Sequence, residues 1–250
     1  MSQYSFGAGV LYGKSLTNVP ATPVRFGALQ DVSIDFQFTN KELYSSSQFP
    51  VAIGRGTGKI AGKASFAQFN AQTFNDLFFG LSNPATGVAR VVVEEAATVT
   101  SNIVTAAHNT GVFTADYGVV LASDHSLFIR VANTPTGQQY SCNETTGVYT
   151  FNSSQNAAAV LVSYTWNDAS NGKSIAISNQ LLGLSPQFIA VFTSSFTRLN
   201  ATKKMTMVLN ACTSSKLTLA TKLEDFVIPQ FEFAAYADDS GNIGTFNMEE

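Results

Sequence analysis

The feature that most limits how this chain can fold is a strict alternation of apolar and polar residues. The alternation is unbroken in Val32–Phe38 and returns in Lys59–Phe66. A period of two residues is typical of a β-strand that buries one face. Met205–Asn210 and Phe226–Tyr236 continue the pattern. The sequence therefore predicts a mainly β protein, a β-sandwich or barrel.

One segment has the spacing of a helix instead. Ala71–Phe79 carries its apolar residues three and four positions apart, as an amphipathic helix does. Asn70 in front of it is a suitable N-cap, and Gly80 behind it is a suitable C-terminal stop. The sequence thus predicts one flanking α-helix, and a second short helix at Asn179–Leu182.

The apolar side of the first alternating strand is expected to pack against this helix. Both segments place large apolar side chains on one face, and each face needs a covering layer. The residues predicted to make this helix–sheet contact are Val32, Ile34, Phe36 and Phe38 on the strand, and Phe74, Leu77 and Phe78 on the helix.

The middle of the chain has a different texture. Residues 87–171 are rich in Val, Thr, Ala and Tyr, and short strands such as Val148–Phe151 and Ala159–Trp166 alternate with turn clusters. Strands at such close spacing predict a small β-sandwich. The expected organisation is a sheet domain in two parts, 1–86 and 172–250, with an inserted domain at 87–171.

Charge is scarce and arranged in blocks. Only 12% of the 250 residues are charged, and the net charge is −3. Counted by segment, the net charge is +3 for residues 1–93, −5 for 94–172, +6 for 173–223 and −7 for 224–250. Protein interfaces are depleted in charge, and opposite blocks attract. We therefore expect self-association, with the +6 and −7 blocks meeting across subunits, or, as the alternative, pairing within the chain.

Composition excludes several classes of protein. A chain that is 45% hydrophobic with 20 Phe residues is not disordered. A pI near 5.4 argues against a strongly basic nucleic-acid binder. The sequence has no apolar run of the length that a membrane span needs, and its first residues do not predict a secretory signal.

The sequence does not match the common motifs of metal-binding, phosphate-binding or disulfide-stabilised proteins. The two histidines, His108 and His125, are not spaced with other ligands as in a zinc site. The two Gly-Lys-Ser sites lack the earlier glycine of a phosphate-binding loop. Cys142 and Cys212 form no disulfide framework. We therefore expect no enzyme, no catalytic or metal-binding residues and no cofactor.

Two stretches of sequence resemble a known family. The first runs through Leu29–Tyr44, Gln48–Ala52 and Gly54–Phe66 to the helix that follows Asn70; the second contains Leu209–Lys216, Glu224–Phe226 and Asp238–Gly244. Together, over about residues 1–85 and 175–250, they resemble a bacteriophage tail tube protein (major tail protein). The middle, with Val160–Trp166, resembles the immunoglobulin-like modules that decorate such virion proteins.

The resemblance implies a structural virion protein of a long phage tail. In that family six copies form a ring, the inner strands of the ring join into one barrel around a channel, and rings stack into a tube by helical assembly. The implied partners are a tape-measure protein inside the tube, the tail terminator and baseplate or tip proteins, and double-stranded DNA in transit during genome ejection. A sheath is implied only if the tail is contractile. The implied location is the virion, after assembly in the host bacterial cytoplasm, with no membrane contact.

The resemblance also suggests which residues make the tube. A long polar loop is a candidate for contact with a neighbouring ring, and an ordinary exposed hairpin loop is the alternative. DNA must slide through a channel, so we expect neutral or acidic side chains on the lumen face, although Lys59 and Lys63 lie on the strand expected beside it. The inter-ring candidates are Thr39, Asn40, Lys41, Glu42, Leu43, Tyr44, Ser45, Ser46, Ser47, Gln48 and Phe49; the lumen candidates are Ser33, Asp35 and Gln37.

Other functions stay open. One alternative is a carbohydrate-binding β-sandwich module, which needs an exposed aromatic platform, whereas the single Trp166 lies in an apolar strand. Another is a different virion or secretion-tube component. The inserted domain is expected to project outward, as decoration or as a contact for host surface glycans, and such a bulky domain favours a non-contractile tail.

Overall fold

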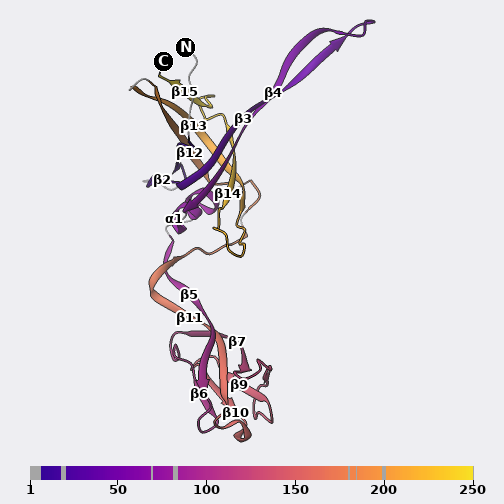
Figure 1. Cartoon of the computed structure of the whole chain (residues 1–250). Helices are drawn as coiled ribbons and strands as arrows, with labels where there is room; N and C mark the ends of the chain where they lie inside the picture. The colour runs from indigo at the N-terminus through magenta and orange to yellow at the C-terminus, as the bar shows by residue number, and fades with distance from the viewer. Residues whose placement is uncertain are drawn as a thin grey trace. The chain divides into compact units, whose positions relative to one another are not determined.

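The computed structural model describes residues 7–17, 21–68, 70–80, 84–179, 181–183, 185–198 and 201–249. Strands account for 61% of the chain and helix for 5%, so the predicted mainly β fold is confirmed. The chain divides into two compact units (Figure 1). Unit 1 comprises Met1–Pro84 and Ile175–Glu250, and unit 2 comprises Ala85–Ser174.

Unit 1 is built on one eight-stranded antiparallel sheet. Seven strands follow the order β2-β1-β12-β13-β14-β4-β3. The eighth, β15, pairs with the first part of β13, while β14 pairs with its last part. The strands are β1 (Val10–Ser15), β2 (Val24–Arg25), β3 (Gly27–Tyr44), β4 (Pro50–Gln68), β12 (Gln187–Arg198), β13 (Ala201–Thr218), β14 (Gln230–Tyr236) and β15 (Gly244–Met248).

The core of unit 1 is aromatic. Phe231 of β14 is fully buried, and its ring lies 5.4 Å from the rings of Phe26, Phe78 and Phe233. Phe188 of β12 completes the group. Burying a side chain of this size stabilises a fold by about 1.5–3 kcal/mol. The alternating apolar residues that predicted the strands therefore supply the packing between strands and helix.

The predicted helix forms, with both of its predicted ends. In α1 (Ala71–Phe74), the Asn70 side chain caps the first turn by accepting a 2.8 Å hydrogen bond from the Thr73 amide. The helix continues as η1 (Asn75–Phe79), a wider π-helical turn, and ends at Gly80 with φ +58°. The amide of Gly80 donates to the carbonyl of Asn75, a bond over five residues that produces the wider turn.

The second predicted helix is wrong for the residues that the structure describes. Asn179 and Leu181 are in irregular chain and Leu182 is in a turn, whereas Gln180 lies outside the described residues. Leu181 and Leu182 are almost fully exposed. A helix this short needs a packed face to be stable, and these side chains provide none.

The predicted helix–sheet contact is wrong for two of its strand residues, and the others share one core with the helix. Leu77 is buried in the core of unit 1, and Val32, Ile34 and Phe78 pack against that core. Phe74 stacks at an angle against Phe78. Phe36 and Phe38 were expected in the same contact, but they are 52% and 46% exposed. Phe36 pairs with Ile60, the last residue of β4 that also pairs with β14, and Phe38 lies beyond that point.

Unit 2 is a small β-sandwich. One sheet has the order β5-β11-β7, the other β6-β10-β9-β8, and residues of both share one core around Tyr149 and Tyr164. An immunoglobulin constant domain groups its first, second, fourth and fifth strands in one sheet; here the first strand pairs with the last, so the strand order differs. The elements are β5 (Ala85–Thr98), β6 (Ile103–Thr105), β7 (Phe113–Leu121), β8 (Ile129–Arg130), β9 (Gln139–Asn143), β10 (Val148–Phe151), η2 (Ser153–Gln155) and β11 (Ala159–Ser174).

Candidate functional site

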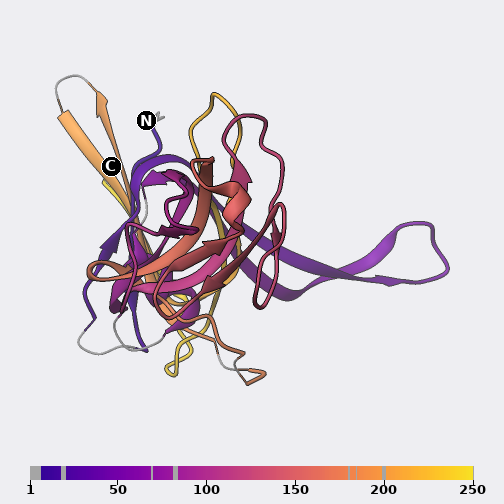
Figure 2. The same ribbon diagram turned by 90° about the horizontal axis from the view of Figure 1, so that it is seen from below.

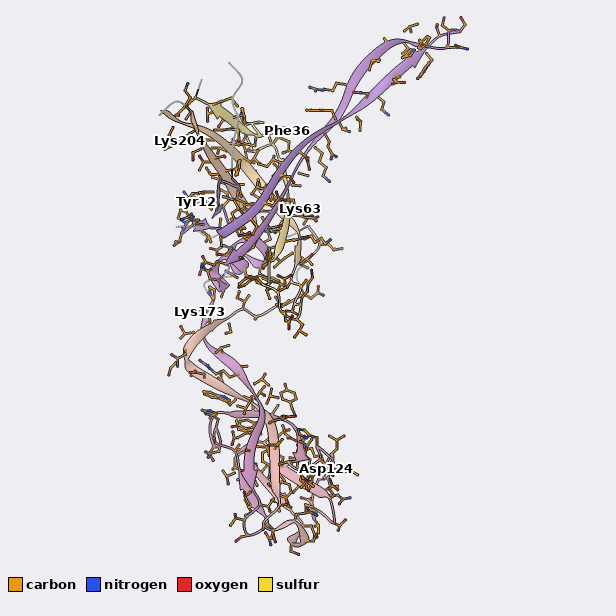
Figure 3. The ribbon with its side chains drawn as sticks, viewed as in Figure 1. Tyr12, Phe36, Lys63, Asp124, Lys173 and Lys204 are labelled. Carbon is orange, nitrogen blue, oxygen red and sulfur yellow. The ribbon has the colours of Figure 1, made fainter. Side chains whose placement is uncertain are left out.

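The most unusual feature of unit 1 is a long two-stranded arm. β14 pairs with β4 only from Ile60 to Ser65, whereas β3 and β4 stay paired with each other as far as Tyr44 and Pro50. Beyond the Phe36–Ile60 pair the hairpin has no third strand, and we call residues 36–59 the arm. Figures 1 and 2 show it extending beyond the rest of unit 1, and Figure 3 shows Phe36 at its base.

The arm corrects the predicted inter-ring loop. Thr39–Phe49 was expected to be a long loop, but β3 continues to Tyr44 and only residues 45–49 form the turn. Polar contacts hold the two strands together, such as the Thr39 and Thr57 hydroxyls at 3.1 Å. β-Branched and aromatic residues also favour a strand here. The predicted contact of these residues with a neighbouring ring stays a prediction.

Apolar side chains are exposed along the whole arm. Every residue from Phe36 to Phe49 is exposed, and so is every residue from Val51 to Lys59. An isolated two-stranded hairpin is marginally stable in water, and exposed apolar surface of this extent marks an interaction site. The large exposed side chains are Phe36, Phe38, Leu43, Tyr44, Phe49, Val51 and Ile53.

Two local contacts organise side chains on the arm. The guanidinium of Arg55 lies over the ring of Phe38, 3.6 Å from its centroid. The hydroxyl of Tyr44 donates to the carboxylate of Glu42, and this hydrogen bond raises the pKa of Tyr44. A cation over an aromatic ring is worth about 0.5–1 kcal/mol at an exposed site. These contacts are too small to replace a third strand.

The polar face of the sheet carries balanced charge. Glu232 on β14 lies between Lys63 on β4 and Lys216 on β13, directly opposite both. Lys63 also lies opposite Ser33 of β3. With Asp31, Asp35 and Lys59, the part of this face on β3, β4, β14 and the end of β13 has three acidic and three basic residues. Lys14 of β1 and Arg25 of β2 add positive charge farther along the same face.

The three predicted lumen residues lie on this polar face. Ser33 is half-buried, and Asp35 and Gln37 are exposed. Gln37 pairs with Lys59, and Ser33 pairs with Lys63. Both lysines, which would make a lumen basic, therefore lie on this face as well. Each of them has a carboxylate on the same face, next to it on an adjoining strand. This part of the face therefore has no net charge, while its role as a channel lining stays a prediction.

Three contacts join the basic and acidic blocks of the sequence within one chain. Lys216 lies opposite Glu232, and Lys222 Nζ is 3.9 Å from Asp225 Oδ2. Glu249 accepts a 2.8 Å hydrogen bond from the amide of Lys204. Antiparallel pairing of β13 with β14 and β15 produces two of these contacts. The alternative of pairing within the chain therefore holds for these residues, and contact of the blocks across subunits stays a prediction.

In unit 2 the single tryptophan is covered. The ring of His108 stacks on Trp166 with centroids 3.7 Å apart and planes 5° apart. The guanidinium of Arg90 is 5.9 Å from the Trp166 centroid, and it is held by an ion pair with Asp168 at 3.0 Å. A sugar ring needs an open aromatic face to stack on. His108 occupies such a face of Trp166, which disfavours the carbohydrate-binding alternative at this residue.

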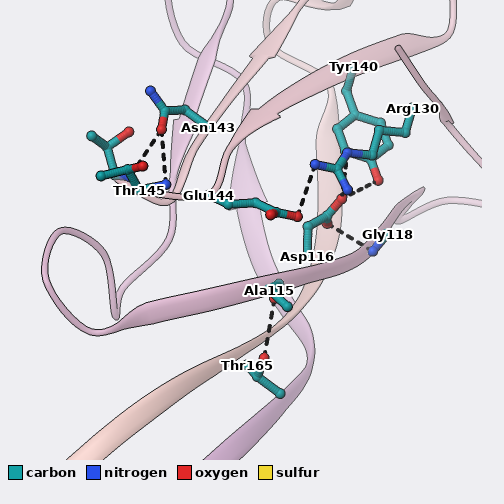
Figure 4. A network of polar contacts seen from close by, with 10 residues as sticks. Ala115, Asp116, Gly118, Arg130, Tyr140, Asn143, Glu144, Thr145 and Thr165 are labelled. Atoms are coloured by element: carbon teal, nitrogen blue, oxygen red, sulfur yellow. Dashed lines mark hydrogen bonds and ion pairs between the residues drawn. The ribbon is translucent and has the colours of Figure 1, made fainter. Parts of the chain in front are cut away.

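A buried carboxylate organises the other side of unit 2. Asp116 accepts hydrogen bonds from the Tyr140 hydroxyl at 2.7 Å and the Gly118 amide at 2.9 Å (Figure 4). Arg130 also lies beside this carboxylate, with its Nε 3.5 Å from Asp116 Oδ2, and it forms a second ion pair with Glu144. Burial, followed by the hydrogen bond to Asp116, raises the pKa of Tyr140 above its usual range. The network ties β7 to β8 and β9.

The two cysteines and His125 lie in surroundings typical of residues with a structural role. Burial raises the pKa of Cys142 and of Cys212 to about 12, so both thiols are protonated at neutral pH. His125 is an exposed residue 3.9 Å from Glu94. Within the described ranges, no group of three or more His, Cys, Asp or Glu residues is arranged to hold a metal. In those same ranges no helix has the length and apolar character of a membrane span.

No role is assigned to these surfaces by similarity to a protein family or to a curated protein. A scan against models of protein families gives no match for the chain, and a search of curated proteins gives none either.

Proposed function

We propose that this protein is a structural subunit of a phage-tail-like tube. Six copies form a ring around a channel, and rings stack into a tube. The observation that carries the proposal is the arm, because a hairpin with exposed apolar side chains on two unsupported strands needs a partner in the functional state. The sequence resemblance over residues 1–85 and 175–250 implies that this partner is another copy of the chain.

Two further features support this role. β3 is the terminal strand of the sheet among the described residues, so its outer edge is available to a strand of a neighbouring subunit. The part of the polar face on β3, β4 and β14, with the end of β13, has no net charge. That suits a surface past which DNA slides, since a basic surface would bind phosphates. In this proposal the tape-measure protein fills the channel before DNA passes, and the tail terminator and baseplate or tip proteins close the ends. The role is structural rather than enzymatic, in the virion.

The proposal is tested by comparing the full chain with a variant that lacks the arm. In that variant an Asn-Gly turn replaces residues 38–58 and joins Gln37 to Lys59, which face each other in the hairpin. Light scattering after size exclusion is expected to show hexamers or longer assemblies for the full chain and monomers for the variant. Thermal unfolding controls for the fold, because the aromatic core lies outside the deleted segment. A full chain that stays monomeric and binds glycans contradicts the proposal.

A further inference from the structure

A second apolar surface lies at the end of unit 1 opposite to the arm. β13 ends at Thr218 and β14 begins at Gln230, and the described residues between them, 219–229, form no strand or helix. We call them the apolar loop. In it, Leu223 is 94% exposed and Phe226 is 88% exposed. Large apolar side chains with so little cover indicate a surface that a partner buries.

An apolar depression adjoins this loop. It lies between the helix and the ends of β13 and β14. The loop contributes Leu219 and Pro229, and the helix contributes Phe74 and Phe78. Because Thr73 is its only polar lining residue, the depression extends the apolar surface of the loop onto the helix.

The arm and the apolar loop lie at opposite ends of the same strands. On β4, the turn of the arm adjoins Pro50, whereas the apolar loop adjoins Ser65, which pairs with Gln230. A strand rises about 3.3 Å per residue, so about 50 Å of strand separates Pro50 from Ser65. Figure 1 shows the arm leaving one end of the sheet. Surfaces at opposite ends of one subunit pair head to tail, and such pairing produces an open polymer.

We infer that the arm tip of one copy docks on the apolar loop and depression of a second copy. This inference rests on the proposed function and names the surface that receives the arm. Charge agrees with the pairing. The arm has a net charge of +2, from Lys41, Arg55 and Lys59 against Glu42. The apolar loop has a net charge of −1, because Glu224 and Asp225 outweigh its one lysine.

The apolar side chains of the two surfaces also match. At the tip, Phe49 is 79% exposed and is followed by Val51 at 60%. Phe49 is the large aromatic side chain of the tip, and its ring can pack on the exposed side chains of Leu223 and Phe226. Docking also gives the unsupported strands of the arm a partner surface, which offsets the marginal stability of a free hairpin.

Cross-linking of mixed single variants tests the contact. Ser46→Cys lies in the turn of the arm and Thr221→Cys lies in the apolar loop, and both positions are exposed. When full-length copies of the two variants are mixed under mild oxidation, we expect covalent heterodimers. Their yield should exceed that of a control mixture by about tenfold or more, because docking raises the local thiol concentration. The control pairs Ser46→Cys with Ser123→Cys, which is exposed on unit 2; each variant alone controls for Cys142 and Cys212.

A second variant separates the inference from the proposed function. Phe226→Ser removes the largest exposed side chain of the loop, and we expect it to abolish the cross-link and to lower the length of assemblies. Leu127→Ser, at an equally exposed apolar residue of unit 2, should change neither. Assemblies that form normally without the specific cross-link overturn the inference and leave the proposed function intact. A chain that does not assemble at all contradicts both, and cross-linking to an unrelated protein in place of a second copy overturns the choice of partner.

Discussion

Ile60 of β4 lies directly opposite Ala235 of β14, and this is the last position at which β4 has a strand on each side. On its other side Ile60 pairs with Phe36, the first residue of the arm. The pair therefore marks where a sheet with a core becomes an unsupported hairpin. The strand residues on the core side of this pair are held by packing, and the residues of the arm depend on a partner.

Amide hydrogen exchange should divide β3 at this boundary. Val32 and Ile34 pack against the core, so their amides should exchange slowly in the free subunit. The amides of the arm should exchange much faster, because opening a two-stranded hairpin exposes no core. In assembled protein the arm should become protected. Slow exchange of the arm in the monomer would show that it is stable without a partner.

Gly62 of β4 should not tolerate a side chain. A Cβ atom at this position would overlap the ring of Phe233, which is buried on the neighbouring strand. We expect Gly62→Ala to lower the free energy of unfolding of unit 1 by about 1–3 kcal/mol, as overpacked cores do. Chemical denaturation followed by circular dichroism measures it. At the matched control, Gly54→Ala in the arm, the nearest atom is 3.9 Å from the new Cβ, so stability should not change.

Asp116 should be the most sensitive acidic residue of unit 2. Asp116→Ala leaves Tyr140 and Arg130 without their shared acceptor, and the loss of such charged hydrogen bonds costs about 2–4 kcal/mol. The single tryptophan, Trp166, lies in β11, so its fluorescence follows the unfolding of unit 2. Asp124→Ala on an exposed turn is the control. An equal loss of stability in both variants would show that the buried carboxylate stabilises unit 2 no more than an exposed one does.

The turn after β14 should respond to acid. Asp238 accepts hydrogen bonds from the Asn242 amide and the Asn210 side chain, and these bonds lower its pKa. A group whose pKa is lowered by folding stabilises the fold above the unfolded pKa, about 3.9 for Asp. Its contribution is lost as the pH falls through the folded value.

Calorimetry of Asp238→Asn checks this dependence. At pH 7 the variant should melt below the parent protein, and the difference should shrink below about pH 4 and then vanish. A difference that stays constant across this range would mean that the carboxylate charge does not stabilise the turn.

Local patterns in the sequence predicted much of the fold. The alternation in Val32–Phe38 and Lys59–Phe66 predicted β3 and β4, and the Asn70 cap and the Gly80 stop predicted the helix. These signals are local, since they depend on neighbours along the chain. The length of the arm was not predicted. The residues around Ser45–Ser47 resemble a loop in composition, and no two-residue turn signal marks the hairpin.

Long-range pairing determined the rest of the candidate site. Phe36 and Phe38 continue the apolar alternation of β3, but they lie at and beyond the last pair between β4 and β14, and both are exposed. The neutral polar face depends on the register that brings Glu232 between Lys63 and Lys216. That register comes from strand pairs far apart in the sequence. A sequence pattern can show which side chains share a face, but not which strands lie beside them.

The central claim is that exposed surfaces of unit 1 are buried between copies of the chain. Electron microscopy of the purified full-length protein, at increasing concentration, tests this most directly. The account predicts six-fold rings with a central channel, and tubes of stacked rings at higher concentration. Single particles of one chain at every concentration, with the arm still exposed, would contradict it.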